Sequence, residues 1–383
     1  MVAYTFYDTD SRVRRYAEAL AKRGDVVDVV ALRQEGEAKE SVLNGVHIYC
    51  IQKRAKNESS KFTYLWRILL FLMHSTLFLT LRHLRDHYDL IHVHSVPDFE
   101  VFSAVIPKLL GCKVILDIHD LLPELYSSKF GSFKKKTHVF RLLVAVEGMS
   151  ASFSDHVIAA NHIWQRRLEE RSVKPGRCTT ILNFPDTDMF RQRGRHRMDN
   201  KVMVLYPGSL HYHQGLDIAI RAFYRIHQQA PEAEFHIYGL GDQTEILKSL
   251  VEELGLTDKV FIRSLLPPEQ IADVIENADL GVVPKRGDGF GNEAFSTKIL
   301  EFMVLGTAVI VPDTMIDEYY FNDRVAQFFH ANDEQSLAEA LLVMIKNHHV
   351  RERLAKSASE FAERYTWDAN KHIYFELVDS LVN

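Results

Sequence analysis

The sequence predicts two α/β domains in tandem, each Rossmann-like with a parallel sheet covered by helices on both faces. Three observations predict this class. The 383 residues exceed what one hydrophobic core usually organises. Short apolar strands alternate with amphipathic helices in both halves of the chain, which is the pattern of a buried parallel sheet. Between the halves, residues 183–200 are polar and lack helical or strand periodicity, as expected for an interdomain linker.

The first half opens on a strand–helix–strand unit. The apolar run 2–6 predicts a strand, and the helical spacing of apolar residues from Val13 to Ala21 predicts a helix that ends at Gly24. Residues 26–31 are then a second strand. The alternation continues with strands 90–94, 113–117 and 156–160 and with helices 99–110 and 139–152.

The second half shows the same alternation of strands and helices, although its sequence is not a close repeat of the first half. We expect strands 202–206, 235–238, 260–262, 280–283 and 308–311, separated by helices 216–228, 243–254, 268–277 and 297–305. The domains are therefore 1–182, a linker 183–200, 201–360, and a final helix 361–383 that packs toward the N-terminal domain. Because open α/β sheets bind ligands beyond the carboxyl ends of their strands, a site is expected in the cleft between the domains.

Composition excludes several classes of protein. A net charge of −5 and a pI near 6.4 argue against a dedicated nucleic-acid binder. Three scattered cysteines can build neither a disulfide framework nor a CxxC site, and the N-terminus lacks the features of a signal peptide, so we expect a cytoplasmic protein. Residues 1–190 hold 26 Lys and Arg against 22 Asp and Glu, a net of +4, whereas the remainder carries −9.

One apolar segment, 68–81, leaves two interpretations open. Its 14 residues are short of the ~20 that a spanning helix needs. A helix of this kind with basic flanks can lie on an anionic membrane surface, and it can equally be a buried helix on the N-terminal sheet. The flanking residues are Lys53, Arg54, Lys56, Lys61 and Arg67 before the segment and Arg82, His83 and Arg85 after it.

The segment 287–310 contains the richest constellation of functional groups. Its glycines predict a mobile loop, Ser296 or Thr297 can cap the helix that follows, and Lys298 lies in the first turn. Backbone N–H groups, the helix dipole and the ammonium together suit a phosphate. Glu293 and Glu301, eight residues apart, could accept hydrogen bonds from hydroxyls on either side of a diphosphate. Spacing alone is equally compatible with a capped amphipathic helix bearing two solvated glutamates.

The same two glutamates match the E-x7-E motif of the retaining glycosyltransferases of family 4, the group 1 glycosyltransferases. These enzymes have the GT-B fold, in which two Rossmann-like domains face a cleft. The sequence resembles the family over nearly its whole length, in the family's order. The matching segments are 90–94, 181–190, 205–215, 237–241, 278–284 and 302–310.

The resemblance implies roles for particular residues. Glu293 would contact hydroxyls of the donor sugar, and Glu301 the ribose of the nucleotide. His119 matches a family histidine near the reacting sugar, although a lone histidine is more often structural; His119 and Glu293 are the catalytic candidates. The donor-binding candidates are Gly208, Ser209, His213, Gln214, Gly239, Gly241, Phe295, Ser296, Thr297, Lys298 and Glu301.

Two departures from the family pattern bear on the leaving diphosphate. Ser209 and Gln214 stand where the family commonly has basic residues, so the charge must be met elsewhere. Lys298 is the first candidate for this role. The first N-domain loop also lacks the usual paired glycines, and Arg12 is a candidate to replace them. The reserve cations are His211, His213, Lys285 and Arg286.

No metal or other cofactor is expected. Asp8-Thr-Asp10 and Asp186-Thr-Asp188 resemble DxD metal motifs, but Asp10 precedes a predicted helix and is expected to cap it. His92 and His94 lie on one side of a strand, and one strand offers no third ligand.

These observations predict retaining, metal-independent transfer of a hexose from a UDP- or GDP-sugar to a hydroxyl acceptor. The expected acceptor is lipid-linked or a growing surface polysaccharide, met at the inner face of the cell membrane through the basic N-terminal domain. A nucleotide-sugar epimerase of the same architecture is one alternative. A non-catalytic nucleotide-sugar binder is another, and Ser209 and Gln214 favour it.

Overall fold

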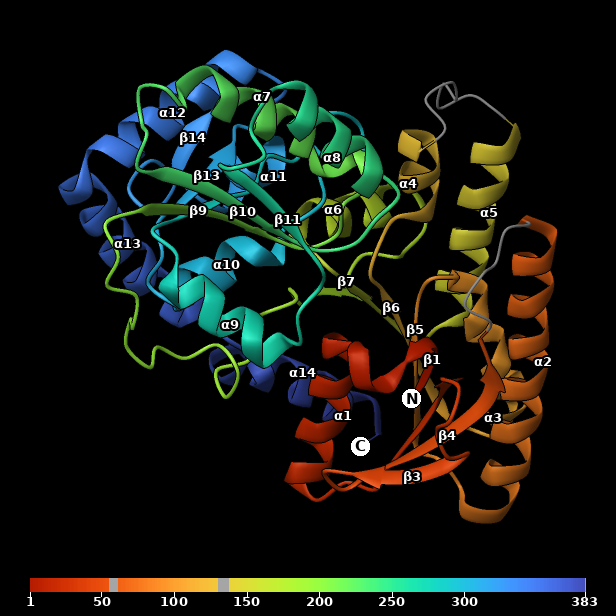
Figure 1. The fold of residues 1–383 in the computed structure, drawn as a ribbon. Helices are drawn as coiled ribbons and strands as arrows, with labels where there is room; N and C mark the ends of the chain where they lie inside the picture. Colours follow the sequence, from red (N-terminus) through yellow and green to blue (C-terminus); the bar gives the residue numbers. More distant parts are fainter. Residues whose placement is uncertain (55–60, 130–137, 383) are drawn as a thin grey trace. The chain divides into compact units, whose positions relative to one another are not determined.

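The computed structural model describes residues 1–54, 61–129 and 138–382. The chain divides into two compact units (Figure 1). Unit 1 is Met1–Asn183 with Lys371–Asn383, and unit 2 is Phe184–Asn370. Each unit has its own sheet, which confirms the prediction of two α/β domains. Lys56, one of the predicted basic flanking residues, lies outside the described residues.

Unit 1 is built on an eight-stranded sheet in the order β3-β4-β2-β1-β5-β6-β7-β8. Its strands are β1 (Val2–Phe6), β2 (Val27–Arg33), β3 (Glu40–Leu43), β4 (Val46–Lys53), β5 (Leu90–His94), β6 (Lys113–Ile118), β7 (His156–Ala159) and β8 (Cys178–Thr180). Its helices are α1 (Ser11–Arg23), α2 (Lys61–Asp86), α3 (Val105–Leu109), α4 (Leu122–Lys129), α5 (His138–Phe153) and α6 (His162–Arg171). Strand order reverses between β1 and β5, so the carboxyl ends of these strands form a topological switch point, where ligands of such sheets bind.

The edge of this sheet departs from the predicted all-parallel pattern. β3 and β4 form an antiparallel hairpin that the strand–helix alternation did not predict. Asn44 and Gly45 make its two-residue turn with φ of 50° and 82°, the left-handed values that a tight hairpin requires. The Asn-Gly dipeptide is therefore a sequence signal for a hairpin that the strand–helix alternation did not take into account.

The helix predicted over 99–110 is also different in the structure. It is a 3-10 helix, Asp98–Ala104, followed by the short α3. Pro107 has no N–H to donate, and it lies in the first turn of α3, where no intrahelical donor is needed. The proline therefore suits an α-helix that starts here and not one that runs through from residue 99.

Unit 2 is built on a parallel sheet in the order β11-β10-β9-β12-β13-β14. Its strands are β9 (Val202–Pro207), β10 (Ala233–Tyr238), β11 (Val260–Arg263), β12 (Leu280–Val282), β13 (Val309–Pro312) and β14 (Gln327–Phe329). Its helices are α7 (Leu216–Ile226), α8 (Thr244–Glu253), α9 (Pro268–Asn277), α10 (Thr297–Val304), α11 (Met315–Tyr320), α12 (Glu334–Lys346) and α13 (His348–Ala362). The division between units falls inside α14 (Trp367–Val382). The switch point of this sheet lies between β9 and β12.

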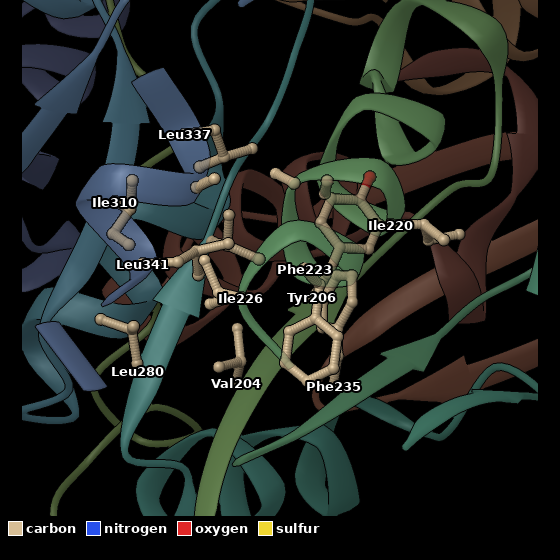
Figure 2. Packing of buried hydrophobic residues seen from close by; sticks show 14 of the residues in the cluster. Val204, Tyr206, Ile220, Phe223, Ile226, Phe235, Leu280, Ile310, Leu337 and Leu341 are labelled. Atoms are coloured by element: carbon tan, nitrogen blue, oxygen red, sulfur yellow. The ribbon is translucent and has the colours of Figure 1, made fainter. Parts of the chain in front are cut away.

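The core of unit 2 holds β9 in place. Figure 2 shows Tyr206 of β9 beside Phe223 of α7 and Phe235 of β10, whose ring centroids are 5.9 Å apart. All three side chains are 0% or 1% exposed. Burial of aromatic side chains this large is a major part of a domain's stability. The residue that follows β9, Gly208, is thereby presented at a fixed position.

Residues 184–200, predicted as a linker, contain no helix or strand and are fastened to the end of α9. The backbone N–H of Gly194 donates to Glu276 at 2.7 Å, and that of His196 donates to Asn277 at 2.8 Å. Arg195 pairs with Asp279 at 2.6 Å. By its contacts the segment belongs to unit 2.

Unit 1 buries a carboxyl group, that of Glu100, for which the described residues provide no ion-pair partner. Glu100 is 0% exposed, accepts a hydrogen bond of 2.6 Å from Ser75 of α2, and its Oε2 has no partner within the described part of the chain. Burial raises the pKa of Glu100 to about 8. A raised carboxyl pKa means that stability is full at low pH and is lost as pH rises toward the folded value.

We therefore predict that Glu100→Gln stabilises the protein more at pH 8 than at pH 5. Glutamine imitates the protonated carboxyl and cannot ionise. The difference in unfolding free energy between variant and wild type should rise by up to ~1.4 kcal/mol per pH unit across this range, measured by urea denaturation. A difference that does not change with pH would contradict the buried neutral state of Glu100.

Candidate functional site

In unit 2, the end of β9 meets the first turn of α10 at a single close contact. Gly208 has φ +148°, and a Cβ built on it would lie 2.0 Å from Cε of Lys298. The aliphatic part of Lys298 therefore crosses directly over the glycine. Only glycine combines this backbone conformation with this approach.

The charge of Lys298 is not neutralised by an ion pair within the described residues. Its Nζ lies 5.7 Å from the ring centroid of Tyr206. Burial lowers the pKa of Lys298, Glu301 acts to raise it, and Lys285 lowers it further. A desolvated ammonium beside a π face, without a carboxylate, favours binding of an anion.

The N-terminus of α10 offers backbone donors next to this ammonium. Ser296 is the N-cap residue but makes no capping hydrogen bond, and its buried Oγ has no hydrogen-bond partner in the described ranges. Phe295 packs its ring against Tyr320 at 4.9 Å, so only its backbone is available. Thr297 begins the helix. An uncapped helix N-terminus has unsatisfied N–H groups and a partial positive charge, which suit a phosphate. We call Gly208, Ser296, Thr297 and Lys298 the anion cradle.

Three of the four reserve cations are already paired with carboxylates. Lys285 lies 2.9 Å from Asp317, and Arg286 makes two hydrogen bonds to Asp217, at 2.8 and 2.6 Å. His211 lies 3.0 Å from Asp242. Of the lysines and arginines named from the sequence for the diphosphate, Lys298 alone has no ion pair with a carboxylate within the described part of the chain.

Lys285 instead orders the loop that carries Glu293. Its Nζ donates to the carbonyl of Ala294 at 2.8 Å, and Asn292 accepts from Met315 of α11 at 2.9 Å. The glycine-rich loop, predicted to be mobile, is thus tied down at these points. Glu293 is 7% exposed and Glu301 is half-buried on α10.

The two departures from the family pattern, Ser209 and Gln214, belong to one hydrogen-bonded group. The hydroxyl of Tyr206 lies 2.9 Å from the carbonyl of Ser209 and 3.0 Å from Oε1 of Gln214. Nε2 of Gln214 lies 3.0 Å from Nε2 of His213, and burial lowers the pKa of His213. This group is neutral, so it orders the loop and adds no positive charge.

Gly239 and Gly241 lie under the cradle. A Cβ on Gly239 would stand 1.7 Å from the carbonyl oxygen of Gly208, and one on Gly241 would stand 2.2 Å from that of Leu210. These glycines are required for close packing of the loops after β9 and β10. Their observed contacts support the Gly208 loop from behind.

Unit 1 brings a second polar cluster to the ends of β5 and β6. Asp117 is fully buried, and Arg12 of α1 binds it through Nε at 2.8 Å and NH2 at 2.7 Å. His119 reaches Oδ2 of Asp117 at 3.2 Å and Nδ1 of His94 at 3.2 Å. Burial alone would raise the pKa of Asp117, but Arg12 and His119 outweigh it and hold that pKa well below its usual range.

The ion pair orients His119, whose side chain is 22% exposed. Burial lowers the pKa of His94 to about 4, so His94 is neutral near pH 7. Nε2 of His119 faces the buried carboxylate, which fixes one edge of the ring. Asp117 was not among the predicted site residues. Arg12 was predicted to replace the paired glycines at the donor phosphate, and this is wrong, because the structure buries Arg12 in its pair with Asp117.

The expectation that His92 and His94 have no third ligand partner is also wrong. Their ring nitrogens and a carboxylate oxygen of Asp117, from the neighbouring strand, lie within 4.8 Å of one another. However, Arg12 already binds both oxygens of Asp117, and His92 bonds the hydroxyl of Tyr374 at 2.8 Å. A cation at this trio would have to displace a guanidinium.

The DxD-like motifs have local roles. Asp10 caps α1 by accepting from the N–H groups of Arg12 and Val13, which confirms its predicted role as a helix cap. Asp186 accepts from the N–H of Asp188 at 2.9 Å. Both contacts are helix-cap and turn interactions of the usual kind.

Comparison with protein families gives two matches that together span most of the chain. Residues 9–183 match the glycosyl transferase 4-like domain, and residues 188–361 match the glycosyl transferases group 1 model. An uncharacterised glycosyltransferase of Methanocaldococcus jannaschii is 24% identical over 92% of this chain and 89% of its own. The chain spans about half the length of several further curated relatives.

Solved structures of similar fold cover the chain almost completely. Sucrose-phosphate synthase from Thermosynechococcus elongatus superposes with a TM-score of 0.81 at 18% identity, over 99% of this chain and 98% of that one. HepE of Anabaena, solved with UDP-glucose, gives 0.73 at 15% identity, over 99% and 98%. At these identities the likeness concerns the fold.

The Asp117–Arg12 pair yields a stability prediction. Asp117→Asn removes the charge that compensates buried Arg12, and we expect it to cost ~3–5 kcal/mol of unfolding free energy. Asp379→Asn is a matched control, because Asp379 pairs with Arg23 at the surface and is 51% exposed; it should cost less than ~1 kcal/mol. Equal effects of the two substitutions in urea denaturation would contradict the assignment.

Proposed function

The chain belongs to the group 1 glycosyltransferases, and we propose that it transfers a hexose from a UDP- or GDP-sugar to a hydroxyl acceptor, with retention of configuration and without a bound metal. The observation that carries the proposal is the anion cradle of unit 2. It combines an uncapped helix N-terminus with a lysine that has no carboxylate partner among the described residues. This is the arrangement that a departing nucleoside diphosphate requires.

The cradle would place positive charge where negative charge develops on the leaving diphosphate. As the bond between sugar and diphosphate breaks, negative charge grows on the phosphate oxygens. The ammonium of Lys298 and the first N–H groups of α10 would meet that charge without reorganising. Support comes from the fold likeness to HepE, which was solved with UDP-glucose.

The two glutamates would border the diphosphate. Glu293 precedes α10 in a loop that Lys285 and Asn292 hold, and we assign it to hydroxyls of the donor sugar. Glu301 lies on α10 one turn beyond Lys298, and we assign it to the ribose. In this mechanism the acceptor attacks from the face that the diphosphate leaves, and a phosphate oxygen takes the acceptor proton. No enzymic nucleophile is required.

Unit 1 would receive the acceptor, with His119 near the reacting sugar. We propose a lipid-linked saccharide or a growing surface polysaccharide as acceptor, met at the inner face of the cell membrane by an otherwise cytoplasmic protein. The positive charge of the first half of the chain supports this assignment, because such acceptors lie at an anionic surface.

Lys298→Gln is predicted to weaken UDP or GDP binding about 10- to 100-fold, since a hydrogen bond from a charged group contributes ~1.5–3 kcal/mol. The measurement is a thermal-shift titration against UDP-, GDP-, ADP- and TDP-sugars, in which one UDP- or GDP-sugar should raise Tm. Lys248→Gln, on the exposed face of α8 and paired with Glu245, should bind like wild type. The unliganded K298Q protein should be no less stable than wild type, because the substitution removes a half-buried charge that has no ion-pair partner among the described residues.

Glu293→Gln is predicted to lower turnover ~100-fold or more while donor binding changes only a few-fold. The assay follows UDP or GDP release from the donor that the titration selects, with and without an added saccharide acceptor. Turnover at the wild-type rate would show that Glu293 is not at the reacting sugar. Conversion of the donor to its epimer without nucleotide release would instead establish an epimerase, and binding with no turnover in wild type would establish a binder.

A further inference from the structure

The long helix α2 has two apolar faces, and only one of them is packed against unit 1. Ile68, Phe71, Ser75 and Leu79 recur every three or four residues and are at most 4% exposed. They form the face that packs on the unit. This accounts for one of the two interpretations of the segment 68–81, a helix packed on the N-terminal domain, but it leaves the opposite face to be explained.

The opposite face exposes large apolar side chains along almost the whole helix. Seven of them are each 42% to 62% exposed, and we call them the α2 stripe. At 1.5 Å per residue the stripe is about 30 Å long. Monomeric soluble proteins rarely leave so long an apolar strip uncovered. Its members are Leu65, Trp66, Leu69, Met73, Leu77, Leu81 and Leu84.

Length and composition would allow α2 to cross a membrane, but its contacts hold it in place. The segment Thr63–Asp86 is long and apolar enough to span a bilayer, with 22% of its most apolar window buried. Yet Ser75 donates to the buried Glu100 at 2.6 Å, and Gln52 of β4 donates to the carbonyl of Arg67 at 2.9 Å. A helix anchored by one face can meet a membrane only with the other, lying along its surface.

Charge indicates what covers the stripe. From Lys61 to Asp86 the helix has four Lys and Arg against one acidic residue, a net of +3. Asp86 pairs with Arg82 and Arg85, and Arg85 is 75% exposed. Basic side chains beside an apolar stripe suit the anionic headgroups and acyl chains of a bilayer. Trp66 lies at one end of the stripe, and tryptophan is enriched at membrane interfaces. A second copy of this helix would instead bring like charges together.

We infer that α2 binds flat in the headgroup region of an anionic bilayer, with the stripe directed into the acyl chains. Its use in catalysis rests on the proposed lipid-linked acceptor, whereas the binding itself needs no substrate. This binding mode predicts that vesicle affinity falls in high salt, and it makes Trp66 of the α2 stripe a reporter of the contact.

Tryptophan fluorescence can report this contact. The chain has three tryptophans; Trp164 and Trp367 are 2% and 6% exposed, whereas Trp66 is 62% exposed. Adding vesicles of phosphatidylglycerol and phosphatidylcholine should shift the emission to the blue and protect Trp66 from acrylamide. Co-sedimentation with the same vesicles should weaken in high salt and be weaker still with phosphatidylcholine alone.

The variant that tests the stripe is Met73→Glu with Leu77→Glu, which should reduce vesicle affinity at least about tenfold because two carboxylates enter the acyl region. The matched control is Ile246→Glu with Leu265→Glu, in unit 2, where both residues are also exposed, at 59% and 61%. The control should bind vesicles like wild type.

Three outcomes would overturn the inference. One is absence of vesicle binding by wild type, and another is binding that Met73→Glu with Leu77→Glu leaves intact. The third is a wild-type dimer in sedimentation analysis that this variant dissociates, which would assign the stripe to a second copy of the chain. A UDP- or GDP-sugar thermal shift on the same variants separates the two proposals, because a normal shift leaves the donor function standing when membrane binding fails.

Discussion

A partly desolvated lysine ammonium, with no ion-pair partner among the described residues, is the constraint on which the site of unit 2 depends. The end of the Lys298 side chain lies over Gly208, where a Cβ would stand 2.0 Å from Cε of the lysine. Burial lowers the pKa of Lys298. The tight loops after β9 and β10, the uncapped start of α10 and the loop before it all surround this group. A protein that buries a charge in this way loses stability unless a ligand supplies the counter-charge.

Two other buried charged groups, by contrast, are compensated by an opposite charge. Asp117 is bound at both oxygens by Arg12, and Lys285 is bound to Asp317. Both ion pairs have structural roles. The Asp117–Arg12 pair orients His119, and Lys285 holds the loop that carries Glu293. The paired groups order the site, whereas Lys298 is the group that is available to bind a ligand.

Part of the fold and of the candidate site could be predicted from the sequence. Most strands of both sheets coincide with the predicted apolar runs, although β3, β4, β8 and β14 were not predicted. Helix α9 is found at its predicted bounds, because periodicity and Pro268 at the helix start are local signals. Lys298 was identified because it lies in the first turn of a predicted helix that Ser296 or Thr297 could cap, although Ser296 makes no capping hydrogen bond in the structure. By contrast, Arg12 and Asp117 are 105 residues apart, and no local sequence pattern predicts that they form a pair. The pairing of Lys285 and Arg286 with acidic side chains likewise depends on the tertiary fold.

The most direct measurement of the central claim is a crystal structure of the protein with UDP or GDP, whichever the protein binds. The account predicts that diphosphate oxygens lie within hydrogen-bond distance of Nζ of Lys298 and of the first N–H groups of α10. A nucleotide whose phosphates are held elsewhere, with Lys298 still over the Tyr206 ring and free of any anion, would contradict it.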